Sequence, residues 1–499
     1  MTRLRHRRVL FFFLSFVSLS AGATLLAFIP NLMPFPDKTG AVATYIPAGA
    51  IDEQNPFFQS LGTNGRTCAT CHQPDQAFSL SATGARRVYD RTHGNDPLFA
   101  AVDGANCPTN TSGDPSAHSL LLSNGLIRVG LTPPSNAQFT ISVVHDPYGC
   151  AITYDPNTGA PIISVYRRPI PATNLRFLSA VMFDGRETLL PLNDTNSFET
   201  NLAYDLTDQA KSAVMGHAQG AVAPSAQQLA EIVQFESGLS TAQTFDNQAG
   251  SLSAGSVSGG PQAISSQKYS PGMNDPLAGN PLGASFNQNA FSLYTAWENL
   301  PAQPGFPWSL PSPAAARNER KREIAAGEKI FNTQPLIITG VRGLNDNASI
   351  GSPASITGTC TTCHNTPNIG NHSVALPLDI GTSRQPGYET NPAIIAALQQ
   401  LSTPDLPVYE IRGCPDPQNP GMTLTFYTSD PGKALISGLC SDVNRGKGPI
   451  LRGLAARAPY FHNGSAADLQ QLVRFYDQRF QMNLTAEQQK DLVAFLNSL

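Results

Sequence analysis

Charged side chains are scarce in this sequence. They make up 14% of the 499 residues, and 32 basic against 36 acidic residues leave a formal net charge of −4. No run of Lys and Arg occurs inside the chain, so the basic face that nucleic-acid binding requires is missing. We therefore expect no nucleic-acid partner.

Long apolar runs are missing beyond the N-terminus, and a spanning helix needs about 18 apolar residues. The first residues differ, because four arginines precede an apolar run at residues 9–19 and a small-residue triplet at 21–23. This order is typical of a secretory signal. Since residues 24–29 continue the apolar run, residues 1–33 are predicted to be either a signal peptide or an N-terminal membrane anchor. Both alternatives predict a periplasmic or otherwise exported protein, soluble or anchored by its N-terminus.

The eight cysteines fall into two classes, and four of them belong to two C-x-x-C-H motifs. In this pattern two thiols bond the porphyrin vinyl groups of haem c and the following imidazole ligates iron. A zinc site would need four ligands per metal, and a thioredoxin-like C-x-x-C needs no adjacent His, so these alternatives fit less well. We therefore predict two covalently bound haem c groups. The residues are Cys68, Cys71 and His72 in the first motif and Cys360, Cys363 and His364 in the second.

The other four cysteines have no partner at this spacing. In an oxidising compartment, proximity along the chain favours pairing Cys107 with Cys150 and Cys414 with Cys440. We expect both pairs to staple loops.

Glycine and proline are abundant, with 41 residues of each, while the hydrophobic content of 41% is ample for a core. We expect a mainly α fold of two cytochrome c-like haem domains with long loops and a loop-rich middle insertion. The first haem domain is assigned to residues 40–240, the insertion to residues 241–310, and the second haem domain to residues 311–499.

Capping patterns mark several helices. Residues 314–331 read as a charged helix in which Gly327 is a close-packing position. Capping boxes are predicted to open helices at three points. The pairs are Ser225 with Gln228, Ser465 with Asp468, and Thr485 with Gln488.

The C-terminal region carries a more specific pattern, at residues 448–454 (GPILRGL) and 458–465 (APYFHNGS). With the two haem motifs it resembles the bacterial di-haem cytochrome c peroxidase family, including its MauG-like branch. Further matching segments are Arg168, residues 183–186 (FDGR) and residues 208–210 (DQA). The resemblance covers both haem domains and is weaker at residues 100–160 and 240–310.

The resemblance implies different roles for the two haems. The first is the peroxide-reacting centre with His72 as its proximal ligand, and the second, ligated by His364, receives electrons from a small donor. Peroxide needs an iron with an exchangeable sixth position, whereas fast electron transfer favours two fixed axial ligands.

The resemblance also implies sixth ligands. For the second haem the matching position is Tyr476, with Met482 as the competitor and an ordinary core aromatic as the alternative for Tyr476. For the first haem, His93 lies near the position of a resting distal ligand, but a polar loop residue is the simpler interpretation.

The catalytic residues of the first site depart from the family. The position of the distal acid is Gln219, which cannot transfer a proton as a carboxylate does, so His217 is the candidate for acid–base work or else a hydrogen-bonding wall residue. The aromatic expected between the haems is Phe183 instead of Trp, and phenylalanine is much harder to oxidise. This replacement argues against long-range oxidation of a substrate through an aromatic radical.

Two further binding roles follow from the resemblance. Arg452 is a candidate partner of a haem propionate, with a surface ion pair as the alternative. A Ca²⁺ ion between the domains stays open, but the expected Asn is Pro169, so backbone carbonyls would have to hold it.

The leading hypothesis is an exported peroxidase that reduces hydrogen peroxide to water, with electrons from a small cytochrome c or cupredoxin. The alternatives are a di-haem electron carrier closed by His93 and a MauG-like oxidase of a protein or organic substrate. A homodimer also stays open.

Overall fold

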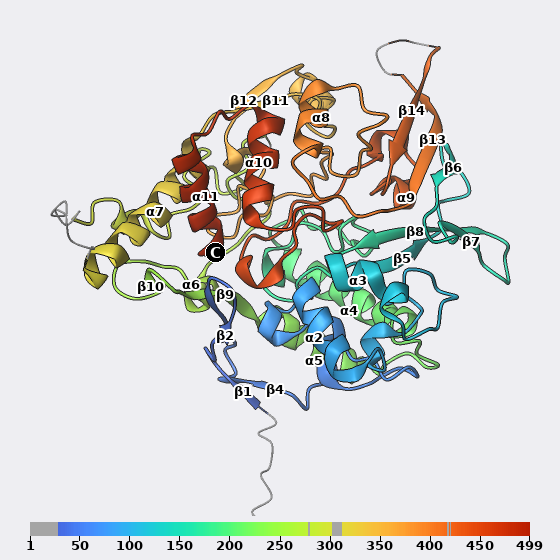
Figure 1. Cartoon of the computed structure of the whole chain (residues 1–499), viewed down its shortest axis with the longest axis horizontal. Coiled ribbons are helices and arrows are strands. Elements are labelled where there is room, and N and C mark those ends of the chain that lie inside the picture. The colour runs from blue at the N-terminus through green and yellow to red at the C-terminus, as the bar shows by residue number, and fades with distance from the viewer. Residues whose placement is uncertain (1–27, 278–279, 302–311, 417–418, 420) are drawn as a thin grey trace, which may run out of the picture.

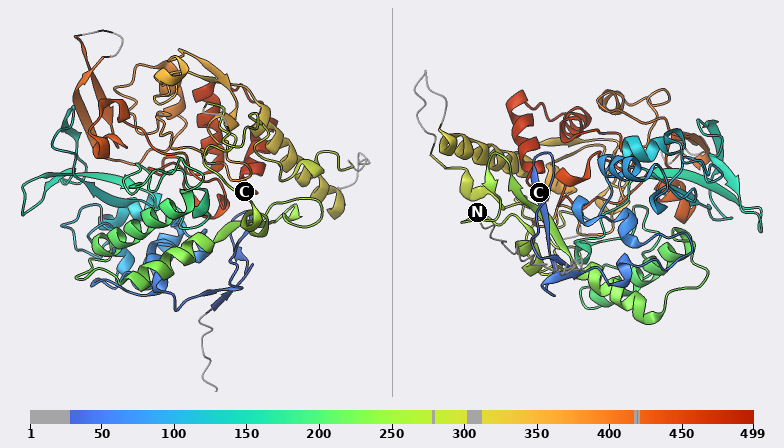
Figure 2. Two further views of the ribbon diagram at one scale, coloured as in Figure 1. Left: turned by 180° about the vertical axis from the view of Figure 1, so that it is seen from behind. Right: turned by 60° about the horizontal axis from the view of Figure 1, so that its bottom comes forward.

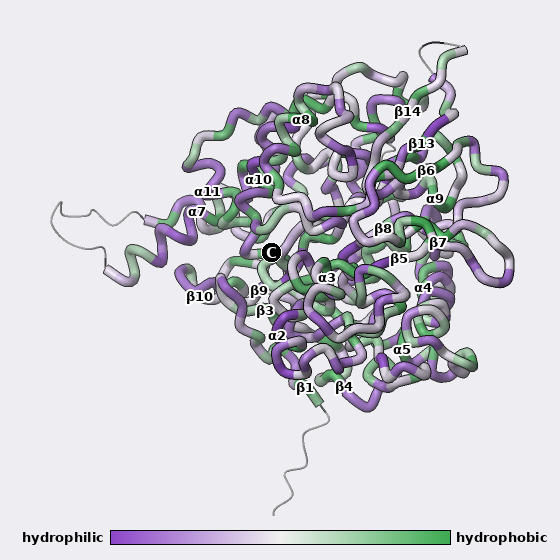
Figure 3. The backbone as a smooth tube through the Cα atoms, turned by 45° about the vertical axis from the view of Figure 1, so that its right-hand side comes forward, coloured by the Kyte–Doolittle hydropathy of each residue, from purple (hydrophilic) through white to green (hydrophobic). Residues whose placement is uncertain are grey.

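The computed structural model describes residues 28–277, 280–301, 312–416, 419 and 421–499. Most of the predicted N-terminal signal or anchor, residues 1–33, lies outside these ranges, as does Trp308. Within them, no helix has the length and apolar character needed to cross a membrane. Figure 3 agrees, because polar and apolar segments alternate along the tube without a long apolar run.

The described residues form both α-helices and β-strands. The α-helices are α1 (Cys68–Cys71), α2 (Ala82–Thr92), α3 (Ser119–Asn124), α4 (Phe198–Gly216), α5 (Ala226–Gly238), α6 (Pro261–Ser266), α7 (Pro313–Thr333), α8 (Pro392–Leu398), α9 (Ala434–Ser437), α10 (Leu469–Phe480) and α11 (Ala486–Asn497). The strands are β1 (Phe28–Pro30), β2 (Phe35–Pro36), β3 (Gly40–Tyr45), β4 (Ala50–Asp52), β5 (Ile127–Leu131), β6 (Thr140–His145), β7 (Ile152–Tyr154), β8 (Pro161–Arg167), β9 (Ser240–Asp246), β10 (Gly250–Ser251), β11 (Leu336–Ile338), β12 (Ile356–Gly358), β13 (Val408–Pro415) and β14 (Thr423–Thr428).

The expectation of a mainly α fold is wrong. The described residues are 32% helix and 16% strand, with five small sheets, so the fold is mixed α/β. The strands are short, and several pair with partners far away in the sequence: β3 pairs with β9, and β13 pairs with β6. Short strands whose partners are distant give little local signal, because packing against cross-strand neighbours rather than backbone preference stabilises them.

The two predicted haem regions lie against each other. Figure 1 shows the blue and green elements of the first region below the orange and red elements of the second, and Figure 2 shows α4 and α5 side by side on the first region. The sheet β14-β13-β6 joins them, since β6 comes from the first region and β13 and β14 from the second. Its residues Tyr409 and Ile411 are buried in one cluster with Ile163 and Val165 of β8.

The middle segment contributes to both regions. β9 completes the sheet with β3, while Phe291, Tyr294 and Trp297 are buried in the core of the C-terminal helices. Its described part is thus packed rather than free, although its assignment as a separate insertion stays a prediction.

Local predictions are partly confirmed. The capping boxes at Ser225 and Thr485 open α5 and α11, whereas α10 is capped by Asp468 itself, which accepts from the Gln471 backbone N–H, so the box starting at Ser465 is wrong. A Cβ on Gly327 would lie 2.0 Å from the Asp491 carbonyl oxygen, which confirms the close packing of α7 on α11.

The two predicted cysteine pairs lie at disulfide distance. Cys107 and Cys150 have Cα atoms 5.9 Å apart, and Cys414 and Cys440 have Cα atoms 5.4 Å apart. Cys68, Cys71, Cys360 and Cys363 are free thiols. The division into two classes of cysteine is therefore confirmed.

Candidate active site

One cavity joins the two C-x-x-C-H motifs. Its volume is about 420 Å³, and its wall is mostly apolar. Both pairs of motif cysteines, His72 and His364 line it, together with residues of α4, α10 and α11. The motifs lie almost three hundred residues apart in the sequence, so it is the fold that places them around a common space.

The first motif is built on a short helix. Thr67 caps α1 through the Thr70 backbone N–H, and His72 follows directly after its last turn. His72 Nδ1 lies 3.1 Å from the Phe78 carbonyl oxygen. Because a carbonyl only accepts, Nδ1 carries the proton, which leaves the Nε2 lone pair for a metal. Burial lowers the pKa of His72 to about 4, against the opposing effect of the Phe78 hydrogen bond, so the imidazole is neutral at neutral pH.

The second motif repeats this arrangement. Thr359 and Thr362 form a reciprocal capping box around the turn that carries Cys360, and His364 Nδ1 donates to the Gly370 carbonyl. The acceptor again lies six residues after the histidine. Burial also lowers the pKa of His364, so both imidazoles offer a neutral Nε2.

The motif thiols are held in their neutral form. Burial raises the pKa of Cys71 to about 11 and those of Cys360 and Cys363 to about 12, and it also raises the pKa of Cys68. Such thiols are protected from oxidation and metal capture, which both require the thiolate. Among the described residues no group of three or more His, Cys, Asp and Glu side chains could hold a metal ion.

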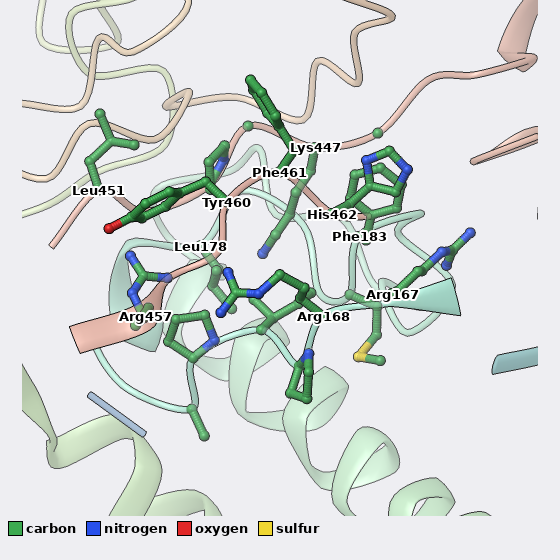
Figure 4. Close-up of a pocket in the computed structure, with 18 of the residues that line it drawn as sticks. Arg167, Arg168, Leu178, Phe183, Lys447, Leu451, Arg457, Tyr460, Phe461 and His462 are labelled. Atoms are coloured by element: carbon green, nitrogen blue, oxygen red, sulfur yellow. The ribbon is translucent and has the colours of Figure 1, made fainter. Parts of the chain in front are cut away.

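Buried cations on the cavity wall provide an independent test of the haem prediction. Arg168, Arg457 and Lys447 line the cavity, and Figure 4 shows their charged ends turned toward the same space. Burial, together with the neighbouring Arg457 charge, lowers the pKa of Arg168 to about 9, and burial lowers the pKa of Lys447 to about 7.

These cations bond to backbone groups. Arg168 Nη2 and Lys447 Nζ donate to the carbonyls of Leu80 and Ala180, at 3.1 and 3.0 Å, and Arg168 Nε has no partner among the described residues. Burying a cation that has no carboxylate partner costs free energy unless another anion pairs with it. Haem propionates supply such an anion, so the residues present fit haem.

Arg452, the cation predicted for this role, is not among the described residues that line the cavity, but its Nε and Nη2 have no hydrogen-bond partner among the described residues, so its role at a propionate stays a prediction. It is 1% exposed, and its Nη1 donates to the Asn368 carbonyl at 3.2 Å. Its electrostatic neighbours are Tyr294 and Glu328. The sequence analysis overlooked Arg457, five residues later, which lines the cavity.

A histidine and a buried carboxylate meet on the wall near the first motif. His217, at the C-terminal end of α4, lines the cavity, and its Nδ1 bonds Asp103 Oδ2. Asp103 Oδ1 accepts from Arg66 Nη1. Burial alone would raise the pKa of Asp103, but the His217 hydrogen bond and the Arg66 charge hold it below its usual value. Asp103 is therefore an ionised partner of His217 that the sequence analysis missed, because it lies more than a hundred residues before its partner.

The other two candidates of this region lie away from the cavity. Gln219 is exposed, and its Oε1 accepts from Asn64 Nδ2 at 3.4 Å. His93 is the exposed C-cap of α2. The described cavity lining includes neither residue, so the structure brings together His72 and His217 but leaves Gln219 and His93 outside.

Both candidates for the sixth ligand of the second haem line the cavity. Tyr476 stacks on Phe480 with ring centroids 5.7 Å apart, and burial, together with the neighbouring Cys363 and Cys360, raises its pKa. Met482 is buried in the core formed with α11. Tyr476 is thus close to the second motif, and Met482 stays open as the alternative.

An aromatic contact connects the two regions beside the cavity. Phe183 stacks on His462 with centroids 4.7 Å apart and an interplanar angle of 12°, and Figure 4 shows the two rings overlapping. Arg167 lies 5.0 Å from the Phe183 centroid and pairs with Asp430 at 2.7 Å. Phe183 lines the cavity, and its place between the haems stays a prediction.

The candidate calcium position shows a competing contact. The Pro169 carbonyl accepts from Ser79 Oγ at 2.7 Å. This carbonyl is already used within the protein, and calcium stays a prediction.

The cavity is also lined by a carboxylic acid that the sequence analysis did not identify. Glu236 of α5 lines the cavity, and its Oε2 has no hydrogen-bond partner among the described residues. Burial raises the pKa of Glu236 to about 8. The sequence analysis made no prediction for Glu236, which is buried where α5 packs against α4.

Comparison with known proteins gives one informative match. No family model matches the chain. The chain is 32% identical over 149 residues to a protein named cytochrome-c peroxidase IdrP2 of Denitromonas iodatirespirans, a match that covers 28% of this chain and 36% of that protein. The chain thus spans about a third of the length of this relative. The match supports, for that part of the chain, a relationship to a cytochrome c peroxidase-like family.

Proposed function

We propose that the chain is an exported di-haem c-type peroxidase that reduces hydrogen peroxide to water with electrons from a small redox protein. The observation that carries this proposal is that both C-x-x-C-H motifs line one cavity, on whose wall His217 is held by the ionised Asp103. The partial match to a protein named cytochrome-c peroxidase supports the same reaction class.

The first site supplies the groups that peroxide reduction needs. Cys68 and Cys71 would attach the first haem and His72 would ligate it, while His217 can take and return a proton at its free ring nitrogen. A haem bound here would supply the iron that accepts peroxide and would pass on electrons from the redox donor. Apolar side chains from α4, such as Ala213 and Val214, line the same wall and limit the water that can compete there.

The second site supplies a dry environment for electron transfer. Cys360 and Cys363 would attach the second haem and His364 would ligate it, with Tyr476 or Met482 on the wall to fix the sixth position. Two fixed axial ligands reduce the structural change that accompanies electron transfer. We propose that electrons enter here from a small cytochrome c or cupredoxin.

The position of two residues favours this proposal over its alternatives. His93 is exposed and lies outside the described cavity lining, so it does not support an electron carrier whose first iron is closed by that residue. Phe183 lines the cavity, and its ring is hard to oxidise, which does not support a MauG-like oxidase.

The proposal is tested by removing each attachment site separately. Cys68→Ala/Cys71→Ala and Cys360→Ala/Cys363→Ala should each lower the haem content from two to one per chain, measured by intact mass and pyridine haemochrome. Only the first variant should lose the spectral change that peroxide produces in the half-reduced protein. A wild type that contains two haems but shows no reaction with peroxide after half-reduction would contradict the peroxidase and favour the electron carrier.

A further inference from the structure

Asp103 lies between two cationic or titratable side chains at the edge of the cavity. One carboxylate oxygen accepts from Arg66 Nη1 and the other from His217 Nδ1. The Asp103 and Arg66 side chains are 4% and 3% exposed, whereas His217 is 40% exposed and lines the cavity. The carboxylate is therefore hidden behind the histidine.

Arg66 is held rigidly by the backbone. Its Nε donates to the Pro97 carbonyl at 2.7 Å and its Nη2 donates to the Leu98 carbonyl at 2.9 Å. A guanidinium fixed at three nitrogens gives Asp103 one orientation, because the side chain fork is planar. The position of the second carboxylate oxygen, and with it the plane of the His217 ring, is thus set by buried structure.

The proton on His217 can be placed from this geometry. An ionised carboxylate only accepts hydrogen bonds, so the proton of the neutral imidazole is on Nδ1. Nε2 then carries a lone pair, and within the described part of the chain no hydrogen bond occupies it. A wall residue that merely filled space would not need a buried ion pair behind it.

We propose that Asp103 is the positioning residue of the peroxide reaction, which fixes His217 as a base with its Nε2 toward the cavity and stabilises the imidazolium formed when it takes a proton. This inference rests on the proposed function and deepens it. It explains how the site works with Gln219 at the position of the family's acid. The carboxylate is kept, but one imidazole away from the substrate.

The proton balance is complete with these groups. His217 Nε2 takes a proton from one oxygen of H₂O₂, so that an O–H bond breaks and an N–H bond forms. The imidazolium returns this proton to the other oxygen as the O–O bond breaks, and the second oxygen leaves as water. Two electrons from the redox donor and two protons from solvent complete the reduction of H₂O₂ to two waters.

The charged and titratable groups around His217 are few. Asp103 faces its Nδ1, and Arg66, which bonds the other oxygen of Asp103 and also lines the cavity, donates from Nη1 to the His217 carbonyl oxygen at 3.3 Å. His72 is the third, since a charge on His217 would act on it across the cavity. The negative charge of Asp103 stabilises an imidazolium on His217 beside the Arg66 guanidinium, which is why removing this charge should weaken the base.

Cyanide provides a test that does not depend on turnover. It enters a haem pocket as HCN and must give its proton to a base as it binds. We expect Asp103→Asn to slow cyanide binding to the ferric protein by about 10²-fold, because an amide can donate to Nδ1 and place the ring proton on Nε2. His217→Gln should slow it equally, and the double variant should be no slower than His217→Gln, since the two residues act as one unit. Asp96→Asn is the control, because it removes a nearby carboxylate while keeping a residue that can cap the same turn.

A second measurement covers the outcome in which Asp103→Asn does not fold. The ¹⁵N signals of His217 in the reduced, carbon monoxide-bound wild type, assigned by comparison with His217→Gln, should show a proton on Nδ1 and none on Nε2. The opposite tautomer, or unchanged cyanide binding in a folded Asp103→Asn, would overturn the inference. If the cyanide and NMR results are as expected but the wild type does not reduce peroxide, the positioning of His217 by Asp103 is supported and the proposed function fails. If peroxide is reduced equally well without Asp103, the inference alone fails.

Discussion

The two motif sites share one design on the proximal side and differ on the cavity wall. His72 and His364 each follow a capped turn, and each donates from Nδ1 to a backbone carbonyl six residues later. Burial lowers the pKa of both. The proximal halves therefore offer iron the same ligand in the same protonation state.

The walls are different. Near the first motif the wall includes His217, Glu236 and Arg66, with the buried Asp103 bonded to both His217 and Arg66. Around the second motif Ile338, Val473 and Leu496 are buried in one core, and the potential ligands Tyr476, Met482 and His372 also line the cavity. The difference teaches that the attachment motif fixes the cofactor, whereas the side chains that face it decide between proton chemistry and electron transfer.

The comparison predicts that the largest effect on turnover comes from substituting a residue of the cavity wall near the first motif. His217→Ala should lower the peroxide reaction rate by about 10²- to 10⁴-fold, the usual cost of losing a general acid–base group. Both haem spectra should stay nearly intact, because His72 and His364 keep their own hydrogen bonds. Stopped-flow kinetics of the half-reduced protein measures the rate.

The matched control for His217 is on the same helix. Met215 is 39% exposed and lies outside the described cavity lining, so Met215→Ala should leave the rate unchanged. Full activity in His217→Ala would remove the proposed distinction between the two walls.

A smaller effect is expected from Glu236, on stability rather than turnover. Burial raises its pKa to about 8, so between pH 5 and 8 the folded state keeps a proton that the unfolded chain has lost. The folded state therefore binds more protons, and the free energy of unfolding falls as pH rises through this window. Glu236→Gln should remove this slope and stabilise the protein at pH 7 by about 3 kcal/mol, measured by denaturant unfolding at several pH values.

Glu328 in the second region is the contrasting carboxylate. It is buried as well, but it accepts from the backbone N–H groups of Leu293 and Tyr294 and from the Thr295 hydroxyl, at 2.7, 3.0 and 2.9 Å. Glu328→Gln should destabilise the protein, because an amide nitrogen would face one of these donors.

For Glu236, an equal pH slope in wild type and Glu236→Gln would contradict the assignment of the slope to Glu236.

The smallest effect on turnover is expected from substitutions in the cavity wall near the second motif. Tyr476→Phe should convert the second haem from low-spin to five-coordinate or change its potential, while the peroxide chemistry at the first site persists. Met482→Leu is the paired variant of similar volume. If the spectrum changes in Met482→Leu and not in Tyr476→Phe, the sixth ligand is Met482.

Some local features could be predicted because the signal is contiguous. The capping boxes at Ser225 and Thr485 and the packing role of Gly327 depend on a few neighbouring residues and are confirmed. The mixed α/β fold could not be predicted, because β6 and β13 become strands by pairing with each other across the two regions. The mainly α expectation failed for that reason.

The sequence by itself determined the two C-x-x-C-H motifs, the grouping of the other cysteines into two pairs, and His217 as the titratable residue to examine. Only the tertiary structure decided that both motifs line one cavity, that Arg457 lines it, and that Asp103 stands behind His217. The physical reason is that covalent and capping chemistry is encoded at spacings of two to four residues. The protonation and orientation of a side chain depend instead on burial and on charges brought close by folding.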